Sequence, residues 1–277
     1  VQFSHFLSGN FIVFLFGFIT FPILTRFLPK DEYGVLGLVT ITTTIVVTFA
    51  KAGLSDGIIR FYGGYCSSEE DKTIFASTIF CRGILFSAIV VILYVAFFPK
   101  IYKFLNLEPE YLTSFQIMGV YLFIKPLNII VLNLMRVNGK TIFINIANFI
   151  DKALSVCLSL MLLIYIFHQI YGYFIGVIIS EIFITVFLFI WFFKHYKVSI
   201  QKVSKDLAFS LIKFGSPLLL TEISYLILSY IDRYMIVFYH GENMLGLYTV
   251  GYNLAMYVAG IITFSLSYAI IPVYVDV

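Results

Sequence analysis

Charged residues are scarce in this chain of 277 residues. Asp, Glu, Lys and Arg together make up 12% of the sequence, whereas soluble globular domains carry about 25%. Hydrophobic residues make up 61%, which is more apolar surface than one water-soluble domain of this length can bury. These proportions exclude an ordinary soluble enzyme and predict a membrane protein that crosses the bilayer several times.

Cysteine and catalytic motifs are also rare or missing. Cys66, Cys81 and Cys157 lie in or near apolar segments, which is typical of free buried thiols rather than of a disulfide framework. The four histidines are scattered, and neither HExxH nor the phosphate-cradling GxxxxGK[ST] occurs. We therefore expect no enzyme activity, metal or cofactor. The net charge of +3 gives no indication of nucleic-acid binding.

Apolar stretches long enough to cross a bilayer, about 20 residues each, follow one another along the chain and are separated by polar turns. We predict an all-α polytopic membrane helix bundle. Lys and Arg are more numerous in the loops on the side of the N-terminus, which predicts a cytoplasmic N-terminus. The eight expected spans are approximately Phe6–Leu28, Val35–Ser55, Ile74–Pro99, Tyr111–Met135, Thr141–Phe167, Ile170–Phe193, Phe214–Tyr239 and Leu245–Pro272.

The first and seventh expected spans resemble each other. Each carries two glycines and one arginine in the same order, Gly9, Arg26 and Gly34 in one and Gly215, Arg233 and Gly246 in the other. The two copies are six spans apart, so both enter the membrane in the same direction, as in two like-oriented lobes. The expected organisation is an N-terminal six-helix lobe at 1–198, an amphipathic linker at 199–213 and the first two helices of a truncated C-terminal lobe at 214–277.

The linker is interpreted from its periodicity. Apolar residues recur at helical spacing from Ile200 to Leu211, and charged residues fall elsewhere on the helix. That pattern predicts a short helix lying along the cytoplasmic membrane surface. The alternative is a solvated loop ahead of the seventh span.

Three segments resemble a known family. They are TRFLPKDEYGVLGL after the first span, AGLSDGIIRFYGGY at the end of the second, and SYIDRYMIVFYHGENMLGLYTVGYNLA across the seventh and eighth. They resemble the bacterial polysaccharide-export flippases, which include the Wzx-type O-antigen flippases, in the multidrug/oligosaccharidyl-lipid/polysaccharide exporter superfamily with its MATE-like fold. Members have twelve to fourteen spans in two lobes around a central cavity, which these eight spans do not complete.

The resemblance implies a function and partners. Full-length relatives move a polyprenyl-diphosphate-linked oligosaccharide, an O-antigen or capsular repeat unit, from the inner to the outer leaflet of the bacterial cytoplasmic membrane. The implied partners are this lipid-linked glycan, membrane lipids, and polysaccharide polymerase or assembly proteins. The alternative with the same fold is a cation-coupled MATE-type drug exporter. Net positive charge in the cavity would favour a lipid phosphate, and an excess of acidic residues would favour cationic drugs.

Several charged residues fall near the middle of their spans, where a lipid-facing charge costs about 2.5–3.5 kcal/mol. Lys125, Asp151, Lys152, Glu181 and Glu222 must therefore face protein or water. Lys125 and Asp151 are equally far from the turn at Asn138, so we predict that they form a structural ion pair at one depth. The alternative is direct contact with substrate.

The fifth span has a polar face. Asn145, Asn148, Lys152, Ser155 and Ser159 alternate at spacings of three and four residues, so their side chains share one side of the helix. Such a face either donates hydrogen bonds to a neighbouring helix, as polar residues in membrane bundles commonly do, or lines a water-filled cavity.

The candidate site residues follow from the resemblance, which implies that the first, second, seventh and eighth helices line the central cavity. Arg26, Arg60 and Arg233 are the candidate substrate-binding cations, because the planar guanidinium binds phosphate through two parallel hydrogen bonds. Glu222 and Asp232 are the candidate cavity or coupling acids. For Arg26 and Arg60 the alternative is anchoring at the membrane surface.

Overall fold

The computed structural model describes the backbone of residues 16–275 and the side chains of residues 16–260, and the described backbone is helical without strands. Residues 6–15 of the predicted first span lie outside the described residues. A helix covers Phe16–Phe27. The others are α2 (Lys30–Lys51), α3 (Leu54–Tyr65), α4 (Glu69–Phe104), η1 (Pro109–Tyr111), α5 (Leu112–Val137), α6 (Thr141–Met161), η2 (Leu162–Phe167), α7 (Ile170–His195), η3 (Ile200–Lys202) and α8 (Lys205–Val275).

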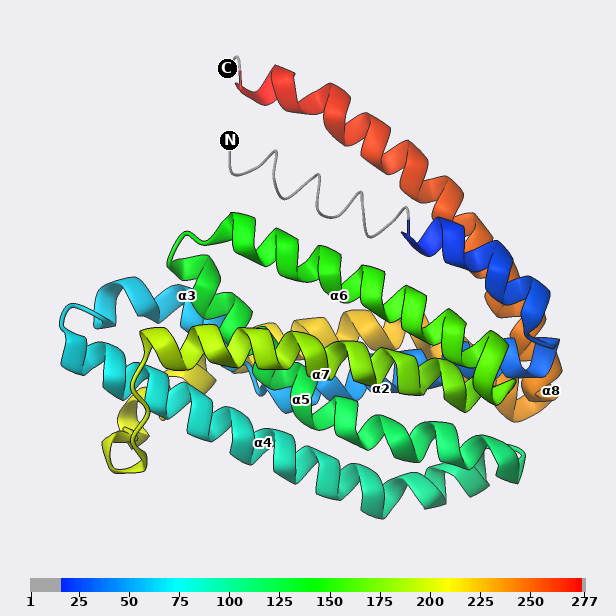
Figure 1. The fold of residues 1–277 in the computed structure, drawn as a ribbon, viewed down its shortest axis with the longest axis horizontal. Coiled ribbons are helices and arrows are strands. Elements are labelled where there is room, and N and C mark those ends of the chain that lie inside the picture. The colour runs from blue at the N-terminus through cyan, green and yellow to red at the C-terminus, as the bar shows by residue number, and fades with distance from the viewer. Residues whose placement is uncertain (1–15, 276–277) are drawn as a thin grey trace.

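The long helix α8 contains two spans. Gly241 interrupts it with φ 76° and ψ 180°, a conformation available almost only to glycine. The predicted seventh and eighth spans therefore lie on either side of one residue. The second half leaves the bundle and runs beside helix 16–27 (Figure 1), where the ring of Tyr257 packs edge-on against Phe18 and Phe21.

The bundle has α5 and α7 between α4 and α6, and α2 packs against α5 and α8 (Figure 1). Two apolar clusters stabilise it. One, near the Gly241 end, includes the stacked rings of Phe98 and Phe115, 4.4 Å apart. The other, near α3, includes Phe80 and Phe192, stacked at 4.9 Å. The outward faces of α4, α6 and α7 expose large apolar side chains, as expected of surfaces that contact lipid.

Two of the polar turns expected between the spans, at residues 29–32 and 69–72, are in fact largely the first turns of helices. Residues 30–32 begin α2 and residues 69–72 begin α4. At α4, the Ser68 side chain accepts a hydrogen bond from the Asp71 amide, and the Asp71 carboxylate accepts one from the Ser68 amide. This capping box and the acidic residues beside it favour a helix N-terminus, so charges that indicate a loop in the sequence instead start a helix.

The predicted second span, Val35–Ser55, is interrupted near its end. Ala52 has φ 49° and Gly53 has φ 70°, and this left-handed pair separates α2 from α3. Gly53 also contacts Gly215 of α8 so closely that a Cβ on Gly215 would lie 2.0 Å from the Gly53 carbonyl oxygen. The two backbones touch here because neither residue has a side chain.

The segment 199–213, predicted as one amphipathic helix, is divided between the short turn η3 and the start of α8. Ile200 is 83% exposed, whereas Leu207 and Leu211 belong to the apolar cluster near α3. The amide of Ser199 donates to Ser77 Oγ at 2.9 Å, which attaches the segment to α4. Leu207 and Leu211, which the sequence pattern assigns to the membrane surface, are thus buried against the bundle instead.

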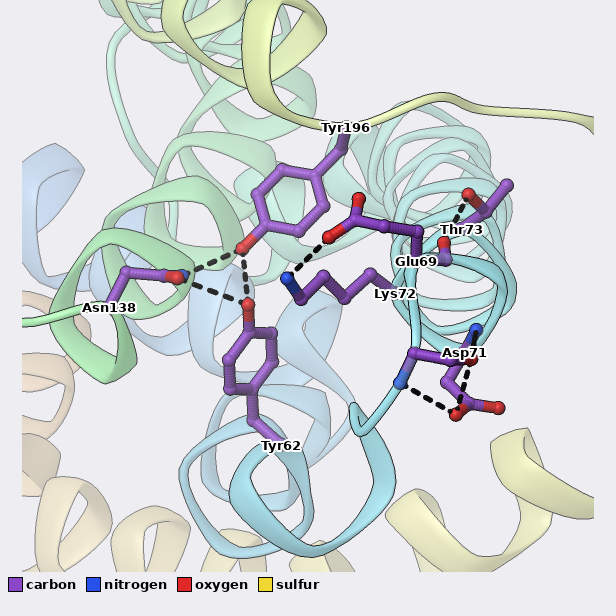
Figure 2. A network of polar contacts seen from close by, with 8 residues as sticks. Tyr62, Glu69, Asp71, Lys72, Thr73, Asn138 and Tyr196 are labelled. Atoms are coloured by element: carbon purple, nitrogen blue, oxygen red, sulfur yellow. Dashed lines mark hydrogen bonds and ion pairs between the residues drawn. The ribbon is translucent and has the colours of Figure 1, made fainter.

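A group of hydrogen bonds joins three separate segments at the α3 end of the bundle (Figure 2). The Tyr62 and Tyr196 hydroxyl oxygens are 2.8 Å apart, and the Asn138 side chain donates to Tyr196 at 2.7 Å and accepts from Tyr62 at 3.1 Å. Burial raises the pKa of Tyr196, so its hydroxyl stays protonated. The triad connects α3, the α5–α6 turn and the end of α7.

Replacing Tyr196 with Phe is expected to lower the free energy of unfolding by about 0.5–1.5 kcal/mol, because the buried Tyr196 hydroxyl makes hydrogen bonds with Asn138 and Tyr62 that the variant loses. Denaturant or thermal unfolding in detergent measures this. Tyr165→Phe is the matched control, since Tyr165 is 76% exposed. Equal unfolding free energies for the two variants would mean that the triad contributes nothing.

Candidate functional site

A polar cavity of about 470 Å³ lies inside the bundle. We use "polar cavity" for the space bounded by α2, α5, α6 and α7 and by Glu222 of α8. Thr40, Thr44, Thr48 and Lys51 line it from α2. Their spacings of four, four and three residues place them on one helix face, so one side of α2 is a ladder of hydroxyl groups that ends in an ammonium group.

Lys125 of α5 lies between two carboxylates in this cavity. Its Nζ is 2.8 Å from Glu181 Oε2 and 3.5 Å from Asp151 Oδ2. The Glu181 side chain is 3% exposed, and the sequence indicated Glu181 only as a mid-span charge. The nearer partner of Lys125 is therefore on α7, and the Asp151 contact that the turn geometry predicts is the longer of the two.

Further hydrogen bonds hold both carboxylates in place. Asn128 donates to Glu181 Oε1 at 2.7 Å, and Ser180 donates to Asp151 Oδ1 at 3.1 Å. Carboxylates buried in low dielectric need such partners to remain ionised. The cluster thereby ties α5, α6 and α7 together at one depth.

Glu222 faces the cavity from α8 and pairs with Lys51 of α2. The Lys51 Nζ lies 2.6 Å from Oε1 and 2.9 Å from Oε2, and Thr48 Oγ1 is 3.4 Å from Oε1. Glu222 is 40% exposed and Lys51 16% exposed. This pair links the first bundle to the chain that follows the linker.

Two residues of the predicted polar face of α6, Lys152 and Ser155, line the cavity. Ser159, one turn further, is buried where α7 comes very close: a Cβ on Gly176 would lie 2.4 Å from the Ser159 Cα. The face therefore serves both roles that the sequence left open, helix packing at one end and cavity lining in the middle.

Arg233 does not line the polar cavity. Its side chain is 3% exposed, and its guanidinium lies over the ring of Tyr252, 4.1 Å from the centroid, with Tyr230 at 5.1 Å. The neighbouring Asp232 accepts a hydrogen bond from Tyr248. Tyr248 and Tyr252 follow the Gly241 break, so these contacts connect the two halves of α8 through cation–π attraction.

The other two candidate arginines are exposed. Arg60 and Asp56 line a shallow hollow of about 350 Å³ between α3 and the first half of α8, and no ion pair joins them among the described side chains. Arg26 lies near the end of helix 16–27. The structure thus brings Glu222, Lys125 and Asp151 to one cavity and leaves Arg26, Arg60, Asp232 and Arg233 outside it.

Lys51 is the cavity residue that sequence reasoning missed. It stands at the end of a span, where a lysine commonly anchors the helix at the membrane surface. The threonine spacing that precedes it is the signal that would have found it. Within the part of the chain that the structure describes, no group of His, Cys, Asp or Glu side chains is arranged to hold a metal ion.

Comparison with solved structures places the fold among membrane transporters. The chain is similar to an inward-facing multidrug resistance MATE family transporter of the MOP superfamily, at 15% identity and a TM-score of 0.70, covering 92% of this chain and 58% of that one. An outward-facing MATE structure gives 15% identity, a TM-score of 0.72 and coverages of 94% and 61%.

The chain is also similar to a MOP superfamily transporter from Pyrococcus furiosus, at 14% identity and a TM-score of 0.73, covering 92% of this chain and 58% of that one. The reverse polarity of that transporter's binding pocket is described as suggesting a different function. The chain thus spans 58% to 61% of the length of these transporters. Curated proteins give no match. Residues 3–277 match the family model described as polysaccharide biosynthesis protein.

Proposed function

This chain belongs to the polysaccharide biosynthesis protein family, and from that premise we propose that it is part of a flippase for a polyprenyl-diphosphate-linked oligosaccharide, an O-antigen or capsular repeat unit. The proposed transport runs from the cytoplasmic to the outer leaflet of the bacterial inner membrane, with the N-terminus in the cytoplasm. Residues 1–198 form the first lobe, 199–213 the linker and 214–277 the start of the second lobe. The mechanism is alternating access between the lobes.

The observation that carries this proposal is the polar cavity inside an apolar bundle. A glycan and its diphosphate need hydroxyl and charged partners, and these groups are expensive in lipid. The cavity is lined by threonine hydroxyls on α2, by three lysines and by Glu222 of α8. Its four bounding helices belong to the proposed first lobe, and Glu222 contributes from the proposed second lobe, so relative movement of the lobes in alternating access would change its exposure.

The charge of the cavity bears on the alternative of a cation-coupled drug exporter. Lys51, Lys125 and Lys152 face Asp151, Glu181 and Glu222, so the acids are not in excess. A site for cationic drugs needs unpaired carboxylates, whereas in this cavity Glu222 and Glu181 both bind lysine. Arg60, exposed near the α3 end, remains a proposed phosphate contact outside the cavity.

The test uses the full-length protein, with both lobes, in proteoliposomes that contain a fluorescent lipid-linked oligosaccharide. A membrane-impermeant reductant quenches only the label in the outer leaflet. Lipid-linked glycan should move between leaflets in vesicles with protein and stay in place in protein-free vesicles. Uptake of a cationic dye by the same vesicles without any movement of the glycan would replace this proposal by the drug-exporter alternative.

The Lys51–Glu222 pair gives a prediction about the transport cycle. If the lobes separate during alternating access, this contact between α2 and α8 must break and form again. Glu222→Lys places two ammonium groups together and should lower the glycan translocation rate by about threefold to tenfold, since like charges in a shielded site repel.

The exchanged pair, Lys51→Glu with Glu222→Lys, restores the attraction and should recover most of the translocation rate. Lys72→Glu in the exposed Lys72–Glu69 pair is the control, because that pair lies on α4 alone and surface pairs contribute little. If the double variant translocates the glycan no faster than Glu222→Lys does, then attraction between these two positions does not contribute to the transport cycle.

A further inference from the structure

The lysines of the polar cavity differ in what their ammonium groups contact. Lys51 is held by both carboxylate oxygens of Glu222. Lys125 is held by Glu181 and Asp151 and also lies over the ring of Tyr121, 5.6 Å from its centroid. Each of these lysines is therefore already neutralised by protein, and neither is free to bind an anion without releasing a carboxylate.

Lys152 is different. Among the described residues it makes no ion pair and no side-chain hydrogen bond, although it lines the cavity. Its sequence neighbour Asp151 attracts it electrostatically but makes no ion-pair contact with it and contacts Lys125 instead. The Asp151 oxygens are also engaged, Oδ1 by Ser180 and Oδ2 by Lys125.

An unpaired ammonium group in the middle of a membrane helix is costly, at about 2.5–3.5 kcal/mol when it faces lipid. Bundles normally remove this cost with a carboxylate partner. Here the partly buried Lys152 faces a space of about 470 Å³, and Ser155 stands one turn along the same face of α6. An anion in the cavity would find a cation and an adjacent hydroxyl donor there.

We propose that Lys152 is the anion-binding residue of the polar cavity and that its ligand is a phosphate group of a diphosphate-linked lipid. The ammonium group binds phosphate as a point charge. The lipid as the source of the phosphate rests on the proposed function, whereas anion binding at Lys152 does not. The other five charged groups are two lysines and three carboxylates that already contact one another, Lys125 being shared by two carboxylates. An anion at Lys152 therefore needs to displace none of these contacts.

The experiment measures binding to the full-length protein in nanodiscs. The three probes are geranylgeranyl diphosphate, the corresponding alcohol, and inorganic diphosphate. Lys152→Met should weaken binding of the lipid diphosphate and of inorganic diphosphate by about tenfold to a hundredfold, the loss of one charge-assisted contact. Binding of the alcohol should not change. Lys152→Arg, which keeps the charge, should stay within about threefold of the unmodified protein.

Lys197→Met is the matched control, because Lys197 is exposed in the segment after α7 and should bind all probes normally. Thermal unfolding of each variant tests the fold separately, and equal loss of affinity for the diphosphate and the alcohol would mean general damage and overturn the proposal. Unchanged affinity of Lys152→Met for both diphosphates would also overturn it, while leaving the proposed function intact.

The sources of the phosphate are distinguished in the same measurements. If the unmodified protein binds inorganic diphosphate through Lys152 but binds the lipid diphosphate no better than the alcohol, the anion site stands and the lipid as its ligand is excluded. If neither diphosphate binds the unmodified protein, the proposal for Lys152 is wrong.

Discussion

Alanine at Gly246 is expected to separate α2 from α8 and to destabilise the folded protein by about 1–3 kcal/mol or more, the usual range for overpacking. The two helices are in backbone contact at this point. A Cβ on Gly246 would lie 1.8 Å from the Lys30 carbonyl oxygen, and one on Gly34 would lie 2.6 Å from the Glu242 carbonyl oxygen. Neither obstacle is a flexible side chain that can move away, so the helices themselves must shift.

Cross-linking measures the separation. Asn253 donates a hydrogen bond to the Tyr33 hydroxyl at 3.0 Å, which brings α2 and the second half of α8 together beside Gly246. A Cβ on Gly37 of α2 would lie 3.7 Å from the Thr249 Cβ of α8, which is within the Cβ separation of a disulfide. In a background without the three native cysteines, the thiols introduced by Gly37→Cys and Thr249→Cys should therefore form a disulfide readily. The yield should fall strongly once Gly246→Ala is added, and thermal unfolding of the same variant gives the loss in stability.

Gly251→Ala is the matched control. It lies on the same half of α8, and a Cβ there meets nothing within 4 Å. Alanine should even favour the helix at this position, so cross-linking and stability should be unchanged or higher. If Gly246→Ala cross-links as well as Gly251→Ala, then the contact between the backbones does not hold the two helices together.

Lys125→Met should cost about 3–5 kcal/mol of folding free energy, the range observed when one member of a buried ion pair is removed. The substitution keeps the length of the side chain but leaves Glu181 and Asp151 without a cation, and Glu181 is 3% exposed. Because Asn128 and Ser180 remain as donors, each carboxylate keeps hydrogen bonds and loses only its counter-charge. Denaturant unfolding of the full-length protein in detergent measures the difference.

Two companion variants separate charge from packing. Lys125→Met with Glu181→Gln removes the buried carboxylate as well and should recover more than half of the loss, since glutamine still accepts from Asn128. Lys72→Met removes an exposed partner of Glu69 and should change stability by less than about 1 kcal/mol. A loss at Lys125 no larger than that at Lys72 would show that the cluster does not stabilise the fold.

The membrane spans were predictable because about 20 consecutive apolar residues are the length that a helix needs to cross the bilayer. The ends of the helices were less so. Lys30 to Glu32 and Glu69 to Lys72 are polar enough to indicate turns, but acidic residues near a helix N-terminus also stabilise it through the macrodipole. Which of the two happens depends on contacts such as the Ser68 and Asp71 capping box, whose geometry a hydropathy pattern does not contain.

The cavity was predictable in part. Counting from the turn at Asn138 places Lys125 and Asp151 at one depth, but the rotation of α7 that brings Glu181 closest to Lys125 depends on packing. Arg233 shows the same limit. Its aromatic partners Tyr248 and Tyr252 come from beyond the break at Gly241, and the direction in which α8 resumes is a property of that single φ/ψ pair rather than of the residues around it.

The cluster of Lys125, Asp151 and Glu181 also has a consequence for how the chain enters the membrane during synthesis. Each of the three residues comes from a different helix, so a single one of these helices released into lipid carries an uncompensated charge that costs about 2.5–3.5 kcal/mol. That cost disappears only when α5, α6 and α7 are side by side. Biogenesis is therefore most favourable when the insertion machinery retains α5 until α7 has been made and releases the three helices as one assembled unit.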